Sequence, residues 1–196
     1  MTPIERTREY IASIDLTKVQ LVILGKDAYP TEPTGVAFCK QDWKALTAGN
    51  CSGLYVLQAL GVDWAAEERR QPERLPPDLF ERLAISGVVF LNASYSADVG
   101  GRFTLRDDLN ALVEAYELNR SILAVAKTVI RCGEAKRMDW VPDVEPEAKY
   151  QNVVHPDKRN STNRHVKKDW NALWGNPGSL AGAWPVKSDN ISVTNR

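Results

Sequence analysis

Two short runs of almost purely apolar residues restrict the folds that this chain can adopt. Residues 19–24 (V-Q-L-V-I-L) end at Gly25, and residues 88–91 (V-V-F-L) follow Gly87 and end at the polar Asn92. A strand that is buried on both faces has such a nearly continuous apolar pattern, whereas a half-exposed strand alternates polar and apolar residues. We therefore expect both runs to be strands of a parallel sheet that is covered on both faces.

Two further segments are candidates for the same sheet. Residues 121–126 (S-I-L-A-V-A) have a similar pattern, with a helix as the open alternative, and residues 151–154 (Q-N-V-V) form a short run before His155. Because helical patterns lie between these segments, we expect a three-layer α/β/α fold with a central, mainly parallel four-stranded sheet. The helical patterns cover residues 7–14, 52–60, 78–85 and 105–119.

The length of 196 residues fits one compact domain. We expect a single domain over residues 1–196, with a core at about 15–165 and an irregular tail at about 175–196, where Gly and Pro recur. No apolar run approaches the roughly 18–20 residues of a membrane span, and the first ten residues lack the apolar stretch of a signal peptide. We expect a cytoplasmic monomer that does not associate with membranes.

Basic residues are concentrated in one short segment, although the chain has no net charge. There are 25 Lys and Arg against 25 Asp and Glu, yet residues 158–168 contain five Lys or Arg and no acidic residue. Such a segment is either a solvated loop or a surface that contacts phosphate groups. The cysteines (Cys39, Cys51 and Cys132) and the two histidines lack the spacing of a structural zinc site. We expect neither a metal nor another cofactor.

Polar side chains follow three of the expected strands. Asp27 follows the first, Asn92 the second and His155 the last. Ligands bind at the carboxyl ends of the strands in such folds, and we expect these three residues to meet there. Together they can supply a base, a bidentate hydrogen-bonding group and a donor to developing negative charge. Three unrelated polar loop residues would have the same spacing, and this alternative stays open on spacing alone.

The segments around these residues resemble the motifs of uracil-DNA glycosylases. Residues 25–30 (G-K-D-A-Y-P) and 35–39 (G-V-A-F-C) are similar to the family's G-Q-D-P-Y-H and G-L-A-F-S motifs. Residues 87–93 (G-V-V-F-L-N-A) resemble its G-V-L-L-L-N-T strand. Residues 152–161 (N-V-V-H-P-D-K-R-N-S) stand where the family has its H-P-S-P-L-S loop. The matches follow the family's order and span residues 21–161, which is most of the chain.

The resemblance implies a monofunctional DNA glycosylase that flips uracil out of DNA, hydrolyses its N-glycosidic bond and leaves an abasic site. Asp27 would orient the attacking water and favour the cationic sugar. His155 would hydrogen-bond O2 of the leaving base, because the base departs as an anion. Phe38 would stack on the base, Asn92 would read O4 and N3–H, and Tyr29 would exclude the methyl group of thymine.

The resemblance also implies contacts with the rest of the substrate, which would be single- or double-stranded DNA. Main-chain groups around Gly25 and Lys26 would contact the base. Ser52, near the start of an expected helix, would face a phosphate. Lys158 and Arg159, in the basic segment, would contact DNA as well.

The chain departs from the family pattern, and we interpret it as a divergent member that resembles the family without an iron–sulfur cluster. Lys26 replaces a Gln, Pro30 replaces a His, and Arg159 stands in place of the Leu that fills the gap left by the flipped base. One alternative is a glycosylase for another base, such as hypoxanthine or a mismatched base. A second is a non-catalytic module that binds DNA or abasic sites. A third is an unrelated α/β enzyme that acts on a phosphorylated small molecule, but the sequence contains no recognisable phosphate-binding motif.

Overall fold

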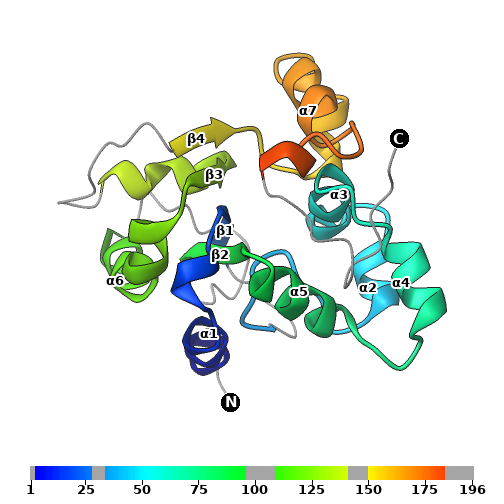
Figure 1. Cartoon of the computed structure of the whole chain (residues 1–196). Coiled ribbons are helices and arrows are strands. Elements are labelled where there is room, and N and C mark those ends of the chain that lie inside the picture. The colour runs from blue at the N-terminus through cyan, green and yellow to red at the C-terminus, as the bar shows by residue number, and fades with distance from the viewer. Residues whose placement is uncertain (1–2, 28–33, 96–108, 141–149, 184–196) are drawn as a thin grey trace.

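The structure is a computed structural model that describes residues 3–27, 34–95, 109–140 and 150–183 (Figure 1). Its centre is a sheet of four strands in the order β2-β1-β3-β4, and all neighbouring strands are parallel. The strands are β1 (Leu21–Asp27), β2 (Val88–Ser94), β3 (Thr128–Cys132) and β4 (Tyr150–Val153). Helices cover both faces of this sheet, so the expected three-layer α/β/α fold with a parallel four-stranded sheet is confirmed.

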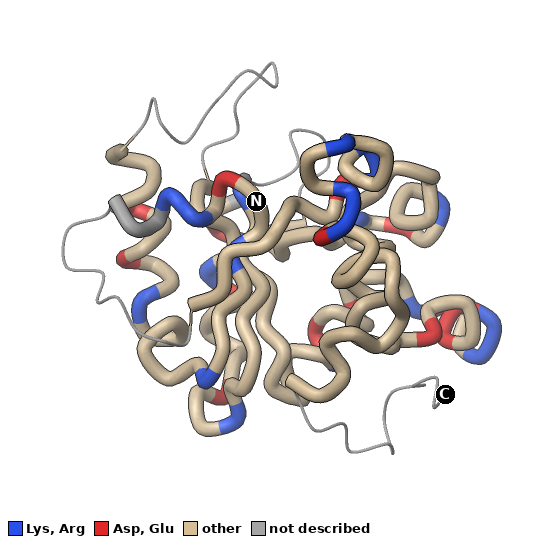
Figure 2. The backbone as a smooth tube through the Cα atoms, turned by 90° about the horizontal axis from the view of Figure 1, so that it is seen from above, with Lys and Arg blue, Asp and Glu red and all other residues tan. Residues whose placement is uncertain are grey.

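The alternation of side chains along the strands divides the core into two layers. Leu21 and Ile23 of β1 point to one layer, together with apolar residues of α2 (Trp43–Thr47), α3 (Ser52–Ala59), α5 (Pro76–Ile85) and α7 (Lys167–Leu173). Val22 and Leu24 point to the other layer, against α1 (Pro3–Ala12) and α6 (Leu109–Val125). Charged positions lie mainly on the outer helices and turns (Figure 2). The continuous apolar pattern of β1 therefore reflects burial on both faces.

Local signals fix the ends of several helices. Oδ1 of Asp42 accepts the N–H of Ala45 at 2.7 Å and caps α2, and Oδ1 of Asp63 accepts the N–H of Ala66 at 2.9 Å and caps α4 (Trp64–Arg70). Such caps satisfy backbone donors that have no partner within the helix. The 3₁₀ segments are η1 (Leu16–Lys18), η2 (Gly133–Trp140), η3 (Lys158–Ser161) and η4 (Ala181–Ala183).

The expected strand at residues 121–126 is wrong, because residues 121–125 belong to the last turns of α6. Asn119, Ile122 and Leu123 are buried at spacings of three and four, which is the pattern of a helix face. The third strand is β3, which the sequence did not indicate because Thr128 and Arg131 interrupt its apolar pattern. The helical patterns at 7–14, 52–60, 78–85 and 105–119 overlap α1, α3, α5 and α6, with 105–108 outside the described residues.

Residues 175–183 pack against α3. The N–H of Gly178 donates to the carbonyl of Gln58 at 2.9 Å, and the N–H of Leu180 donates to that of Ala59 at 2.8 Å. Leu180 is buried in the same core layer as α3. In the described residues no helix has both the length and the apolar character needed to cross a membrane.

Candidate active site

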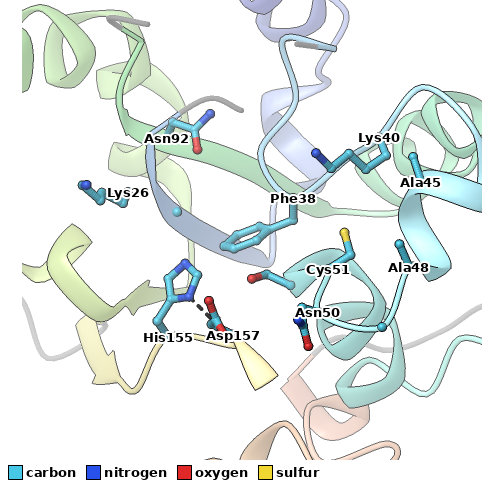
Figure 3. Close-up of a pocket in the computed structure, with 13 residues that line it drawn as sticks. Lys26, Phe38, Lys40, Ala45, Ala48, Asn50, Cys51, Asn92, His155 and Asp157 are labelled. Carbon is cyan, nitrogen blue, oxygen red and sulfur yellow. Dashed lines mark hydrogen bonds between the residues drawn. The ribbon is translucent and has the colours of Figure 1, made fainter. Parts of the chain in front are cut away.

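A cavity of about 520 Å³ lies at the carboxyl ends of β1, β2 and β4 (Figure 3). Its volume falls within the range of about 300–1,000 Å³ that is usual for small-molecule sites. The segment before α3 and the N-terminus of α3 close its opposite side. The cavity is lined by Gly25, Lys26, Phe38, Lys40, Ala45, Ala48, Gly49, Asn50, Cys51, Ser52, Asn92, His155 and Asp157.

Gly25 allows two other residues to approach the backbone of β1 closely. It is the register partner of Asn92 on β2. A Cβ atom at position 25 would lie only 2.9 Å from Oδ1 of Asn92 and 3.1 Å from Cζ of Phe38. Because real Cβ atoms essentially never approach other heavy atoms below 3.0 Å, the observed positions of carboxamide and ring require a glycine here.

Phe38 contributes a buried aromatic ring to the cavity, with only 6% of the residue exposed. Its φ of 64° lies in the left-handed region, which bulky residues rarely adopt. α3 packs directly against its backbone, because a Cβ atom at Gly53 would lie 2.1 Å from the Phe38 carbonyl oxygen. Such strained conformations persist where the surroundings over-determine them, often at ligand sites.

Asn92 lies within β2 and is 2% exposed. Its backbone N–H donates to the hydroxyl of Tyr95 at 3.2 Å, and its carbonyl accepts Nδ2–H of Asn119 at 2.9 Å. Within the described part of the chain, no protein group hydrogen-bonds its carboxamide. In Figure 3 this carboxamide, the Phe38 ring and the His155 imidazole surround a common space. The side chain is thus available to a ligand in the cavity.

His155 presents one ring nitrogen to its own loop and the other to the cavity. Its Nδ1 accepts the backbone N–H of Asp157 at 3.2 Å, and this bond requires Nδ1 to be unprotonated (Figure 3). The proton of the neutral ring therefore resides on Nε2. Burial lowers the pKa of His155, Asp157 opposes this shift, and the charges of Arg159 and Lys26 add to it. The imidazole is consequently a neutral N–H donor at neutral pH.

Contacts from three elements hold the loop that carries His155. Nδ2 of Asn160 donates to the His155 carbonyl at 2.9 Å, and the buried Trp174 donates its Nε1–H to the Val154 carbonyl at 2.7 Å. Gly133, the first residue of η2, has a φ of 59°, and a Cβ atom there would lie 2.9 Å from Cβ of His155. The position of the imidazole is thus fixed by tertiary contacts.

The expected DNA-contacting residues Lys158 and Arg159 are exposed on η3, next to the cavity and outside its lining. Nε of Arg159 donates to both carboxylate oxygens of Asp157 at 3.0 Å, and these hydrogen bonds lower the pKa of Asp157. Asp157 itself lines the cavity. This carboxylate therefore connects the basic segment to the wall of the cavity.

The structure places the other predicted site residues as follows. Lys26 lines the cavity, with its Nζ 3.9 Å from Oε2 of Glu134. Ser52 is the first residue of α3, so the start of this helix faces the cavity. The backbone of Asp27 ends β1, two residues beyond Gly25. Tyr29 lies outside the described residues, and so does the side chain of Asp27.

Sequence reasoning missed three polar residues on the far wall of the cavity, namely Lys40, Asn50 and Cys51. They lie between Phe38 and α3, in a region where the sequence has no pattern that marks a site. In the described part of the chain, Cys39, Cys51 and Cys132 form no disulfide bond. Burial raises the pKa of Cys39 and Cys132, so both behave as apolar core residues.

Comparisons with known proteins bear on the fold. No protein-family model matches the chain, and no curated protein sequence matches it. The solved structures include a similar one, the wild-type UNG, a uracil-DNA glycosylase, from Nitratifractor salsuginis. The TM-score is 0.52 and the sequence identity is 17%, over 87% of this chain and 77% of that chain. This chain therefore has a fold like that of a uracil-DNA glycosylase.

Proposed function

We propose that the protein is a DNA glycosylase that hydrolyses the N-glycosidic bond of uracil in DNA. The observation that carries this proposal is the convergence of Phe38, Asn92 and His155 on one cavity at the carboxyl ends of the strands. The similar fold of a uracil-DNA glycosylase supports it independently of the sequence motifs. The base would enter the cavity as an extruded nucleotide, because its glycosidic bond cannot be reached inside a duplex.

Phe38 and Asn92 would recognise the base. The Phe38 ring offers a face on which a pyrimidine stacks, and stacking contributes about 1–3 kcal/mol per base. The Asn92 carboxamide matches uracil when its oxygen accepts N3–H and its nitrogen donates to O4. A carboxamide turned by 180° would match cytosine instead. Selectivity for uracil therefore depends on holding the Asn92 side chain in one orientation.

Bond cleavage places opposite charges on the two halves of the nucleotide. As the N-glycosidic bond breaks, its electron pair moves to the base and the sugar becomes cationic at C1′. The neutral His155 imidazole would donate Nε2–H to O2, where the negative charge of the base develops. The Asp27 carboxylate would orient the water that attacks C1′ and would accept its proton. The products are free uracil and an abasic site.

The DNA strand would cross the rim of the cavity. The start of α3 at Ser52 provides backbone N–H groups that suit a phosphate. Lys158 and Arg159 are exposed beside the cavity, Arg159 in an ion pair with Asp157, and their contacts with phosphate groups would make binding weaken as salt rises. We further propose that Tyr29 rejects the methyl group of thymine, and that Arg159 takes the place of the apolar residue that fills the gap in the duplex.

Base release from defined oligonucleotides tests the proposal. The substrates carry uracil, hypoxanthine or a thymine mismatch, in single and double strands, with no metal added. We expect alkali-labile sites at uracil. The Asp27→Asn variant should lose about 10²- to 10⁴-fold in rate while still binding DNA. Asp15→Asn is the matched control, because Asp15 caps η1, which precedes β1 at the other end of the sheet.

The outcomes separate the proposal from its alternatives. Release of hypoxanthine or mismatched thymine, but not uracil, would replace the substrate while keeping the reaction. Retention of DNA without release of any base would identify a non-catalytic binding module. Equal rates for Asp27→Asn and the wild type would remove Asp27 from the mechanism.

A further inference from the structure

At Asn92, which lines the cavity, side chains hydrogen-bond to the backbone groups on the outer edge of β2. β2 is an edge strand, because its only neighbour in the described sheet is β1. Buried backbone groups on such an edge need partners from elsewhere. At Asn92 the hydroxyl of Tyr95 accepts the N–H, and Nδ2–H of Asn119 donates to the carbonyl. Both backbone groups of this one residue are thus held from outside the sheet.

The two capping side chains are also bonded to each other. The Tyr95 hydroxyl donates to Oδ1 of Asn119 at 2.9 Å, which closes a ring of three hydrogen bonds around the backbone of Asn92. Tyr95 is 7% exposed, and Asn119, in the middle of α6, is fully buried. Both side chains are buried, so the arrangement ties the backbone of Asn92 to α6.

A similar contact occurs two residues earlier on the same edge. There the hydroxyl of Tyr10, from α1, accepts the backbone N–H of Phe90 at 3.1 Å. Tyr10 is 7% exposed, as Tyr95 is. Phe90, however, points into the core and does not line the cavity. Among the described residues, the edge of β2 therefore has two contacts in which a tyrosine hydroxyl accepts a backbone N–H, and one of the two involves a residue that lines the cavity.

From this difference we infer that Tyr95 and Asn119 are positioning residues, which hold the Asn92 carboxamide where it reads the extruded base. The inference rests on the proposed function. On the cavity side the carboxamide has little room, because its oxygen already lies against Gly25. The hydrogen-bonded ring fixes the backbone from the opposite side. Loss of the ring would let this part of the edge strand shift, and the carboxamide would move relative to the base.

The test compares Tyr95→Phe with Tyr10→Phe, since each variant removes one hydroxyl from one edge contact. Both should lower the melting temperature by a few degrees. Only Tyr95→Phe should slow the single-turnover release of uracil, by about 10- to 100-fold, because displacements of about 0.5–1 Å correspond to losses of this size. It should also reduce the preference for uracil over cytosine. Tyr10→Phe should release uracil within twofold of the wild-type rate.

The inference is overturned if both variants release uracil at the wild-type rate and lose similar amounts of melting temperature. Tyr95 would then have a structural role only. If Tyr95→Phe does not fold, Asn119→Leu replaces it, because this change removes the donor to the Asn92 carbonyl without adding charge. The same slowing of uracil release is then expected, and an unchanged rate overturns the inference.

A spectroscopic measurement separates this inference from the proposed function. If the wild type releases no uracil, the proposed function fails, whatever the variants do. The side-chain NH₂ resonances of Asn92 then report on the positioning. They should shift or broaden in Tyr95→Phe and stay unchanged in Tyr10→Phe. Unchanged Asn92 resonances in both variants would overturn the positioning role.

Discussion

Replacing Gly25 by alanine places a methyl group against two residues of the cavity at once. The new Cβ atom would lie 2.9 Å from Oδ1 of Asn92, 3.1 Å from Cζ of Phe38 and 3.4 Å from Cε2 of the same ring. Ordinary van der Waals contact begins at about 3.4 Å. The amide oxygen must therefore move by about 0.5 Å, and the edge of the ring by somewhat less, if both are to coexist with the methyl group.

The effect on activity should exceed the effect on stability. A displacement of about 1 Å can reduce the rate about 10²-fold, so about 0.5 Å corresponds to a loss of about 10-fold in uracil release. Overpacking costs about 1–3 kcal/mol. The reduced freedom of the unfolded chain offsets about 0.4–1 kcal/mol of this. We expect a destabilisation of about 0–2.6 kcal/mol, which leaves Gly25→Ala folded.

Single-turnover release of uracil and urea unfolding measure the two effects. Gly182→Ala is the matched control, because a Cβ atom at Gly182 would meet nothing within 4 Å. It should match the wild type in rate. If Gly25→Ala releases uracil as fast as the control does, uracil release does not depend on the exact positions of the Asn92 carboxamide and the Phe38 ring, which would contradict the prediction.

Three further predictions concern the groups around the site and one distant ion pair. Because burial lowers the pKa of His155 from 6.5, the native state takes up a proton less readily than the unfolded state, and stability should fall as the pH drops below about 6.5. His155→Gln should weaken this fall, as measured by thermal unfolding. If the melting temperatures of variant and wild type fall in parallel with pH, His155 is not the group responsible. Trp174→Phe removes the hydrogen-bond donor to the Val154 carbonyl, so it should lower the free energy of urea unfolding by about 1–3 kcal/mol and slow uracil release several-fold. A loss of stability without slower release would show that this bond does not position His155. Glu67→Gln removes the charge of Glu67, which is 7% exposed and paired with Arg82, and should cost about 1–3 kcal/mol with uracil release unchanged. Slower release would mean that this pair is coupled to the cavity.

The sequence predicted the fold class because burial on both faces leaves a strong local signal. β1 and β2 have nearly continuous apolar patterns bounded by glycine or a polar residue. β3 gave no such signal, since it buries Arg131, whose guanidinium lies 4.7 Å from the centre of the Tyr150 ring. A buried cation whose aromatic partner lies far away in the sequence cannot be recognised from the residues next to it. The preceding apolar segment, residues 121–126, therefore resembles a buried strand more than β3 does, with a helix as the open alternative.

The short helices were also missed. α2, α4 and α7 have only five to seven residues, so periodicity has little room to appear. α7 begins with two lysines and includes the buried Trp170, whose ring packs against Tyr55 of α3 at 5.0 Å between centroids. Tertiary packing of this kind stabilises a helix that its own sequence barely favours.

At the site, the sequence indicated Phe38, Asn92 and His155, which line the cavity, and missed the side chains that hydrogen-bond to the backbone around Asn92 and His155. Gly25, Asn92 and His155 stand at or near strand ends, where motifs can be recognised. Tyr95 and Asn119, by contrast, act on Asn92 from a strand end and from a helix that begins more than ten residues later. Nothing in the local sequence distinguishes them from ordinary core residues, because their role arises only when the edge of β2 is buried.

A structure of the Asp27→Asn variant bound to an oligonucleotide with a single uracil would decide whether the cavity receives an extruded base. We predict that the uracil ring stacks on Phe38, with N3 and O4 at the Asn92 carboxamide and O2 within hydrogen-bonding distance of Nε2 of His155. An uracil that remains paired in the duplex, or a DNA strand bound to another face of the molecule with the cavity empty, would contradict it.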